Sequence, residues 1–148
     1  MADRPDIRLT ADEQAAYLRV NRKAALATLD KDGFPHVTAM NFVLRDGAFY
    51  MTSYGKAQKV VNIRRNPKVA MMAETGSAYA ELKGVMVRGL CEIIEGEDAV
   101  REAWAIISGA SSTPRRRETN DSAAKRVALK VTPRRIVTWD HTKLGGRY

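Results

Sequence analysis

Short apolar runs separated by turn residues dominate the first half of the chain. Residues 24–29 and 35–44 are apolar or alternate between apolar and polar, and the Asp-Lys-Asp-Gly segment at 30–33 between them is typical of a hairpin turn. A second turn at 45–47, Arg-Asp-Gly, precedes the bulky and β-branched residues of 48–52. The pattern therefore predicts three consecutive antiparallel strands that form a meander.

The second half of the chain continues in the same way. Further strands are predicted at residues 68–73, 79–94, 126–131 and 135–139. Gly84 and Gly89 lie within the longest of them and are typical of bulges, where a sheet bends towards a barrel. Pro133 is expected to form a turn between the last two strands. About seven strands without regular alternation of strand and helix predict a mainly β, antiparallel barrel, which forms one domain over residues 1–148.

Two or three short helices complete the predicted fold, at residues 10–21, 57–66 and 97–108. Thr10 and Glu13 have the spacing of a capping box and mark the start of the first helix. Pro67 ends the second helix, because the residue before a proline is disfavoured in the α region. Residues 109–122 show no periodicity, and a loop that either is solvated or covers an anionic ligand is expected there.

The segment 49–69 combines a strand, a glycine turn and a short helix. Lys56 and Lys59 fall where this helix begins, and the five basic residues from Lys56 to Lys68 have no acidic residue among them. A helix start offers unpaired N–H groups and a partial positive charge, which suit a phosphate. A solvated basic face explains the charge equally well, but the strand-turn-helix pattern favours a phosphate site.

Composition narrows the class of partner. The 148 residues carry a net charge of +8, which favours anions, either nucleic acid or phosphorylated small molecules. Nucleic acid is disfavoured, because aromatic residues make up only 7% and none is interleaved with the arginines at 115–117.

The single Cys91 excludes an internal disulfide and is expected to be a buried, inert thiol. No apolar run of about 20 residues and no signal peptide are found, so a cytoplasmic protein without membrane spans is expected. Two histidines are too few for a zinc site, and no metal is expected.

Four stretches carry a family resemblance: residues 25–38, residues 50–52 together with 59–70, residues 87–93, and residues 137–144. Together they resemble the split β-barrel family of pyridoxamine 5'-phosphate oxidase, most closely its branch of flavin- and deazaflavin-dependent oxidoreductases. The resemblance implies an FMN-binding-like split barrel that forms a homodimer. It further implies two cofactor sites at the subunit interface, which hold either FMN or the deazaflavin coenzyme F-420.

The resemblance places the cofactor phosphate at the start of the helix after the third strand. Lys59 matches the family's phosphate-binding lysine, and Gln58 stands where the flavin oxidases have an arginine, which slightly favours F-420 over FMN. Trp139 is expected to pack on the cofactor ring from the partner subunit or to fill the dimer interface. The cofactor-binding residues implied in this way are Thr38, Met40, Asn41, Thr52, Lys56, Gln58, Lys59, Asn62 and Trp139.

In such enzymes the cofactor carries the hydride, and the protein orients it and excludes water. The resemblance therefore implies an oxidoreductase that acts on a conjugated small-molecule substrate. Pyridoxamine phosphate is disfavoured as that substrate, because no match to the oxidase's substrate-phosphate arginines is found near the C-terminus. No catalytic residue is identified. The alternatives are an FMN-binding protein similar to pyridoxamine-phosphate oxidase, and a cofactor carrier or haem-binding relative without turnover.

Overall fold

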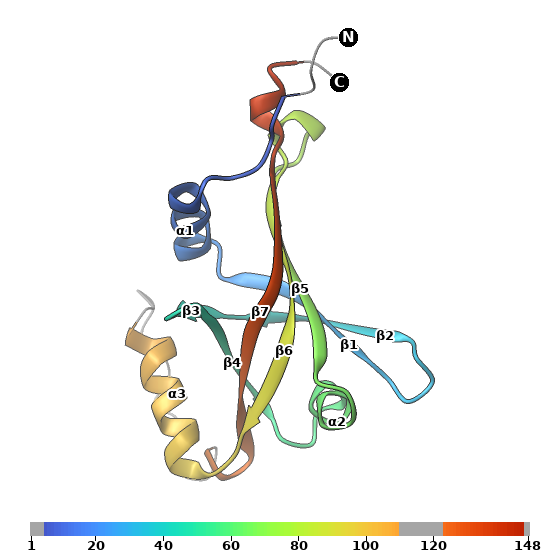
Figure 1. The fold of residues 1–148 in the computed structure, drawn as a ribbon. Coiled ribbons are helices and arrows are strands. Elements are labelled where there is room, and N and C mark those ends of the chain that lie inside the picture. Colours follow the sequence, from blue (N-terminus) through green and yellow to red (C-terminus); the bar gives the residue numbers. More distant parts are fainter. Residues whose placement is uncertain (1–4, 110–122, 147–148) are drawn as a thin grey trace.

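A single antiparallel sheet forms most of the computed structural model, which describes residues 5–109 and 123–146 (Figure 1). Within these residues the sheet has seven strands in the order β2-β1-β5-β6-β7-β4-β3. The strands are β1 (Lys23–Leu29), β2 (Pro35–Asn41), β3 (Val43–Arg45), β4 (Ala48–Tyr54), β5 (Lys68–Thr75), β6 (Lys83–Ile94) and β7 (Arg126–Asp140). The helices are α1 (Ala11–Val20), α2 (Gln58–Arg65) and α3 (Glu97–Gly109), with short 3-10 turns η1 (Tyr79–Glu81) and η2 (His141–Leu144). The predicted mainly β, split-barrel fold with a few helices is confirmed. The predicted loop at 109–122 lies, apart from Gly109, outside the described residues.

The predicted meander is wrong, because the strand expected at 35–44 is two strands. β2 pairs with β1, whereas β3 pairs with β4. The chain changes direction at Phe42, which is buried in the core and donates its N–H to the Arg22 carbonyl oxygen at 2.8 Å. Two consecutive strands therefore lie at the two opposite edges of the sheet, and the sheet is curled rather than flat. Phe42 and Val43 are both buried, which breaks the alternation of a continuous strand.

The turn predicted at Pro133 is also absent, and β7 runs through it without interruption. The register between β6 and β7 shifts between Arg88 and Gly89, so that Pro133 lies opposite Gly89 and Arg134 is an extra residue. A proline is tolerated at such a bulge, because its missing N–H is not needed by the sheet. Gly89 is required here, since an added Cβ would overlap the Thr132 carbonyl oxygen. The bulge expected from this glycine is confirmed, and the two separate strands expected around Pro133 are one.

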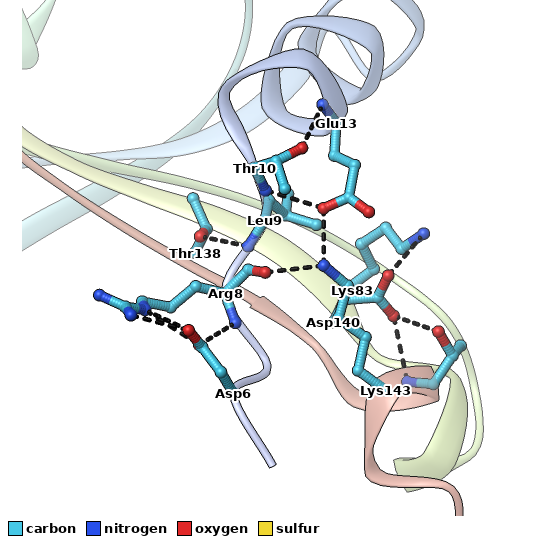
Figure 2. Close-up of polar contacts among 10 residues, drawn as sticks. Asp6, Arg8, Leu9, Thr10, Glu13, Lys83, Thr138, Asp140 and Lys143 are labelled. Atoms are coloured by element: carbon cyan, nitrogen blue, oxygen red, sulfur yellow. Dashed lines mark hydrogen bonds and ion pairs between the residues drawn. The ribbon is translucent and has the colours of Figure 1, made fainter.

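The C-terminal part of β7 extends with β5 and β6 beyond the rest of the sheet (Figure 1). Its end is tied to the N-terminal segment, because Asp140 donates its N–H to the Ile7 carbonyl oxygen. Leu9 also donates its N–H to Thr138 Oγ1 (Figure 2). Lys143 Nζ donates to the Arg8 carbonyl oxygen and to Glu13 Oε2 (Figure 2). These contacts hold α1 against the extended strands.

The buried Asp140 belongs to the same polar cluster. Its carboxylate accepts hydrogen bonds from the Thr142 N–H and hydroxyl, and its Oδ2 lies 3.0 Å from Lys83 Nζ (Figure 2). Burial acts to raise the pKa of Asp140, but the hydrogen bonds from Thr142 and Lys83 outweigh it and hold the pKa below its usual value. Asp140 is therefore a structural carboxylate whose charge is compensated.

One apolar core lies inside the curled sheet, and it includes Leu26, Phe49, Met51, Val60, Leu129 and Val131. Cys91 is buried in this core, and burial together with the Glu92 charge raises the pKa of its thiol to about 12. The expectation of an inert thiol agrees with both facts. None of the helices in residues 5–109 and 123–146 has the length and apolar character needed to cross a membrane.

Candidate cofactor site

Helix α2 follows β4 through a short turn whose backbone is fixed at two points. Gly55 donates its N–H to the Lys125 carbonyl oxygen at 2.9 Å, and Ala57 donates its N–H to the Tyr54 carbonyl oxygen at 3.0 Å. Ala57 is the N-cap residue, and Asn66 is the C-cap residue directly before Pro67. The strand, glycine turn and short helix predicted from the sequence are confirmed, with the helix within a residue of its expected bounds.

Asn62 holds α2 against the sheet from inside. Its side chain is completely buried, and its Nδ2 donates to Thr28 Oγ1 on β1 at 3.0 Å. Its Oδ1 accepts hydrogen bonds from Gln58 Nε2 at 2.8 Å and from the Arg65 guanidinium at 3.3 Å. No atom of Asn62 is accessible for a direct contact with a ligand. The structure therefore gives Asn62 a positioning role and uses Gln58 to support it.

The start of α2 is positively charged and has no acidic residue. Ala57 provides no side-chain cap, and the first turn contains no carboxylate. Lys59 lies in this turn, half-buried, with its Nζ 3.5 Å from Ser53 Oγ on β4. No carboxylate pairs with Lys59 among the described residues, and Lys56 is exposed beside it. First-turn N–H groups without a cap, together with a half-buried lysine, form a site that an external anion can complete.

Strand β2 divides the three residues predicted on it between its two faces. Met40 is buried in the core, whereas Asn41 on the other face is exposed. Thr38 shares the face of Met40, and its Oγ1 is buried without a hydrogen-bond partner in the described part of the chain. A buried hydroxyl without a partner is costly, so Thr38 is the residue of β2 with an unused hydrogen-bonding group.

Thr52 and Trp139 do not meet the α2 entrance within one chain. Thr52 lies on the face of β4 opposite Ser53, beside the buried Ala128 of β7. Trp139 lies near the end of β7, which is at the other end of the long strands from α2 (Figure 1). Its ring covers Gly84 of β6, where an added Cβ would overlap it, and its Nε1 donates to Glu74 Oε2 at 2.9 Å.

Arg126 and Ser53 were missed by the sequence analysis. The guanidinium of Arg126 lies 4.3 Å from the centre of the Tyr54 ring, directly before the turn that leads to α2. Its Nε is buried without a hydrogen-bond partner in the part of the chain described. Arg126 and Tyr54 are cross-strand partners of β7 and β4. No local signal relates residues so distant in the sequence, whereas the alternation of β4 could have indicated Ser53 as a neighbour of Lys59.

The α2 entrance fits the phosphate of an organic cofactor. The α2 entrance and Lys59 offer positive charge for a phosphate, and the Thr38 hydroxyl and Arg126 Nε are buried polar groups that still lack partners. Residues 5–109 and 123–146 contain no group of three or more histidine, cysteine or acidic residues that could hold a metal ion. The polar groups therefore favour an organic anion.

Comparison with known proteins places the chain in a family. The family model for pyridoxamine 5'-phosphate oxidase matches residues 10–140 of the sequence. The chain belongs to the pyridoxamine 5'-phosphate oxidase family. No match is found among the curated proteins.

Solved structures of similar fold agree with membership of the pyridoxamine 5'-phosphate oxidase family. A conserved hypothetical protein from Mycobacterium tuberculosis, Rv2991, is 34% identical with a TM-score of 0.83, and the match covers 100% of this chain and 95% of that one. An F420 reductase is 29% identical with a TM-score of 0.67, and the match covers 82% of this chain and 93% of that one. A FAD-binding protein from Mesorhizobium loti is 25% identical with a TM-score of 0.65, with 88% and 92% of the two chains covered.

Proposed function

We propose that this chain is an oxidoreductase that binds F-420 or FMN and transfers hydride to a conjugated small-molecule substrate. The observation that carries the proposal is the α2 entrance, where Lys59 lies in an uncapped first turn without any acidic residue. The similarity to an F420 reductase and to a FAD-binding protein supports a phosphorylated cofactor of this type. We favour F-420 slightly, because Gln58 adds no second positive charge beside Lys59. Its side-chain amide instead donates a hydrogen bond to Asn62 Oδ1.

The residues of the chain have separate tasks in this proposal. Lys59, Lys56 and the first-turn N–H groups of α2 bind the phosphate, and Asn62 keeps α2 in place through Thr28. When bound, the cofactor supplies the hydride chemistry, and the protein orients it and keeps water away. No side chain is assigned as a proton donor.

We further propose that the protein is a homodimer whose interface is centred on an apolar row on the outer face of the sheet. The strand registers place Ala39, Ala25, Met72, Met86 and Val137 side by side on this face, across β2, β1, β5, β6 and β7. Met72 is 42% exposed and Val137 is 36% exposed. An exposed apolar row of this width is typical of an interaction surface. Within one chain Trp139 is remote from the candidate cofactor site. In a symmetric dimer, Trp139 of one subunit is available to the site of the other subunit.

The dimer is tested by sedimentation equilibrium. Substituting Met72→Lys and Val137→Lys together should convert a dimer into a folded monomer, because the two lysines place charge in the apolar row. Phe34→Lys, at an exposed position on the β1–β2 hairpin, should leave the dimer intact. A monomer in the unsubstituted protein would contradict this interface.

The function is tested by titrating cofactor-stripped protein with F-420 and, separately, with FMN, and by following fluorescence. Micromolar or tighter binding of F-420, followed by reduction of conjugated electrophiles in the presence of its reduced form, is expected. Preference for FMN would identify a flavin enzyme and make oxygen a candidate acceptor. Tight binding without reduction of any substrate would indicate a cofactor carrier, and a Soret band after addition of haem would identify a haem-binding relative. Binding of neither cofactor would contradict the proposal.

A further inference from the structure

Four cationic residues line a hollow at the β6–β7 bulge. The hollow has a volume of about 340 Å³ and is lined by Lys68, Val69, Arg88, Gly89, Leu90, Arg134 and Arg135. Every charged residue in this lining is a cation. The bulge creates this arrangement, because the extra residue Arg134 on β7 places two consecutive arginines beside Arg88 on β6.

These cations repel one another without compensation from the part of the chain that the structure describes. Arg88 and Arg135 are direct cross-strand partners, and like charges at such positions destabilise a sheet. The neighbours of this pair in the register on the same face are Ala70, Met86 and Val137, none of which is acidic. No ion pair or hydrogen bond joins the side chain of Lys68, Arg88, Arg134 or Arg135 to any of residues 5–109 and 123–146.

Two other cations nearby have partners within the chain, which sets the cluster apart. Arg64 on α2 forms an ion pair with Glu95, and Arg65 donates to the Leu29 carbonyl oxygen. The cluster is also separate from the α2 entrance. Lys68 follows the C-terminal end of α2, whereas Lys59 lies at its start, and an eight-residue helix is about 12 Å long. The lining of the hollow shares no residue with the candidate cofactor site.

We propose that Lys68, Arg88, Arg134 and Arg135 form a second anion site, which binds the clustered anionic oxygens of a small molecule. Three planar guanidinium groups and one ammonium group suit a ligand with several phosphate or carboxylate groups. The volume of the hollow falls within the range of small-molecule sites and accommodates a group the size of a triphosphate. This site does not depend on the proposed oxidoreductase function.

The test uses inorganic tripolyphosphate as the probe, with calorimetric titration and thermal unfolding of the full chain. The probe should bind the unsubstituted protein and raise its Tm. Substituting Arg88→Gln and Arg135→Gln together should weaken binding by about tenfold or more and abolish the Tm increase. Without the probe the same variant should have a higher Tm than the unsubstituted protein, because the repulsive pair is gone. Arg134→Gln alone should weaken binding less, and Arg19→Gln on the exposed surface of α1 should change neither property.

Three outcomes would overturn the second anion site: no binding of tripolyphosphate, equal binding by the double variant, or a lower Tm of the double variant without probe. Tighter binding of random oligonucleotides than of tripolyphosphate, lost in the same variant, would assign the cluster to nucleic acid and overturn the small-molecule assignment.

The anionic oxygens could belong to the acidic tail of F-420 or to a separate molecule. These two sources are distinguished by titrating the double variant with F-420 that has a long acidic tail and with F-420 that has a short one. Weakened binding of the long-tailed form alone identifies the cofactor's own extension as the ligand, whereas unchanged binding of both forms identifies a separate molecule. Lys59→Ala separates the two proposals. If it leaves cofactor binding unchanged, the proposed cofactor site fails while the cluster, measured by tripolyphosphate, still stands.

Discussion

Helices α1 and α2 begin in opposite ways, although both follow an extended segment. At α1, Thr10 Oγ1 accepts the Glu13 N–H at 3.2 Å, and Glu13 Oε2 accepts the Thr10 N–H at 2.7 Å. Asp12 and Glu13 add negative charge to the first turn. At α2 the N-cap is Ala57, no side chain accepts a first-turn N–H, and the first turn contains Lys59 in place of an acid.

The difference separates a helix start that is complete from one that requires a partner. The carboxylate of Glu13 also accepts a hydrogen bond from Lys143, so the anion at α1 serves the fold (Figure 2). A missing cap costs about 1 kcal/mol, and a cation at the positive end of a helix adds to that cost. Of these two helices, only α2 has both costs. The arrangement at α2 is thus expected for a helix start whose anion comes from outside the chain.

The largest effect is expected from Lys59→Ala, which removes the cation from the α2 entrance. Loss of a charge-assisted contact to the cofactor phosphate should weaken binding by about 1.5–3 kcal/mol, which is about tenfold or more. Titration of the stripped protein with F-420 or FMN measures the change. Lys31→Ala on the exposed β1–β2 turn is the matched control and should bind like the unsubstituted protein. Equal affinities for all three proteins would place the phosphate elsewhere.

A second prediction separates positioning from binding at the same helix. Asn62→Ala leaves Thr28 and Gln58 without their buried hydrogen-bond partner, so the free energy of unfolding should fall by about 1–3 kcal/mol. Urea unfolding of cofactor-free protein measures this loss. Gln58→Ala removes an exposed residue from the same network and should cost less. A variant that keeps its stability but loses cofactor binding would instead identify Asn62 as a direct ligand.

A third prediction concerns a substitution that introduces a side-chain N-cap at α2, as is present at α1. Ala57 has the extended backbone of an N-cap, so Ala57→Asp should accept first-turn N–H groups and raise the free energy of unfolding by about 0.5–2 kcal/mol. The new carboxylate occupies the place of the phosphate, and cofactor binding should weaken. Ala57→Asn provides the cap without the charge, so its binding should weaken less. Unchanged binding in the aspartate variant would contradict the assignment of this entrance.

The features that the sequence predicts are those whose interacting residues lie close together along the chain. The start of α1 is visible because Thr10 and Glu13 are three residues apart, and the end of α2 because Pro67 follows it directly. Lys59 stands out for the same local reason. Strand pairing has no such signal: alternation marks residues 35–44 as extended but does not show that the chain crosses between sheet edges at Phe42.

Non-local contacts account for the remaining differences. Pro133 is a turn signal in isolation, but Gly89 on another strand provides the bulge that accommodates it. In the candidate site, Arg126 reaches Tyr54 only because β7 pairs with β4. The remote position of Trp139 within one chain likewise follows from the sheet as a whole. The local motif therefore predicted the strand, turn and helix of the proposed phosphate site, whereas the surroundings of this site required the tertiary structure.

The smallest predicted effect is a dependence of stability on pH, and it concerns Glu13 at the start of α1. The hydrogen bond from Lys143 and that from the Thr10 N–H lower the pKa of Glu13. A pKa that is lower in the folded state contributes stability at pH values above the unfolded pKa, which is about 4.3 for Glu. This contribution is lost as the pH falls through the folded pKa. Glu13→Gln should therefore be less stable than the unsubstituted protein at pH 7, and the difference should shrink at pH 3, as measured by urea unfolding. Asp6 and Asp140 also have lowered pKa values, but they titrate in the variant and in the unsubstituted protein alike. The change with pH in the stability difference between the two proteins is therefore due to Glu13. An equal difference at both pH values would show that α1 depends on the shape of the Glu13 cap and not on its charge.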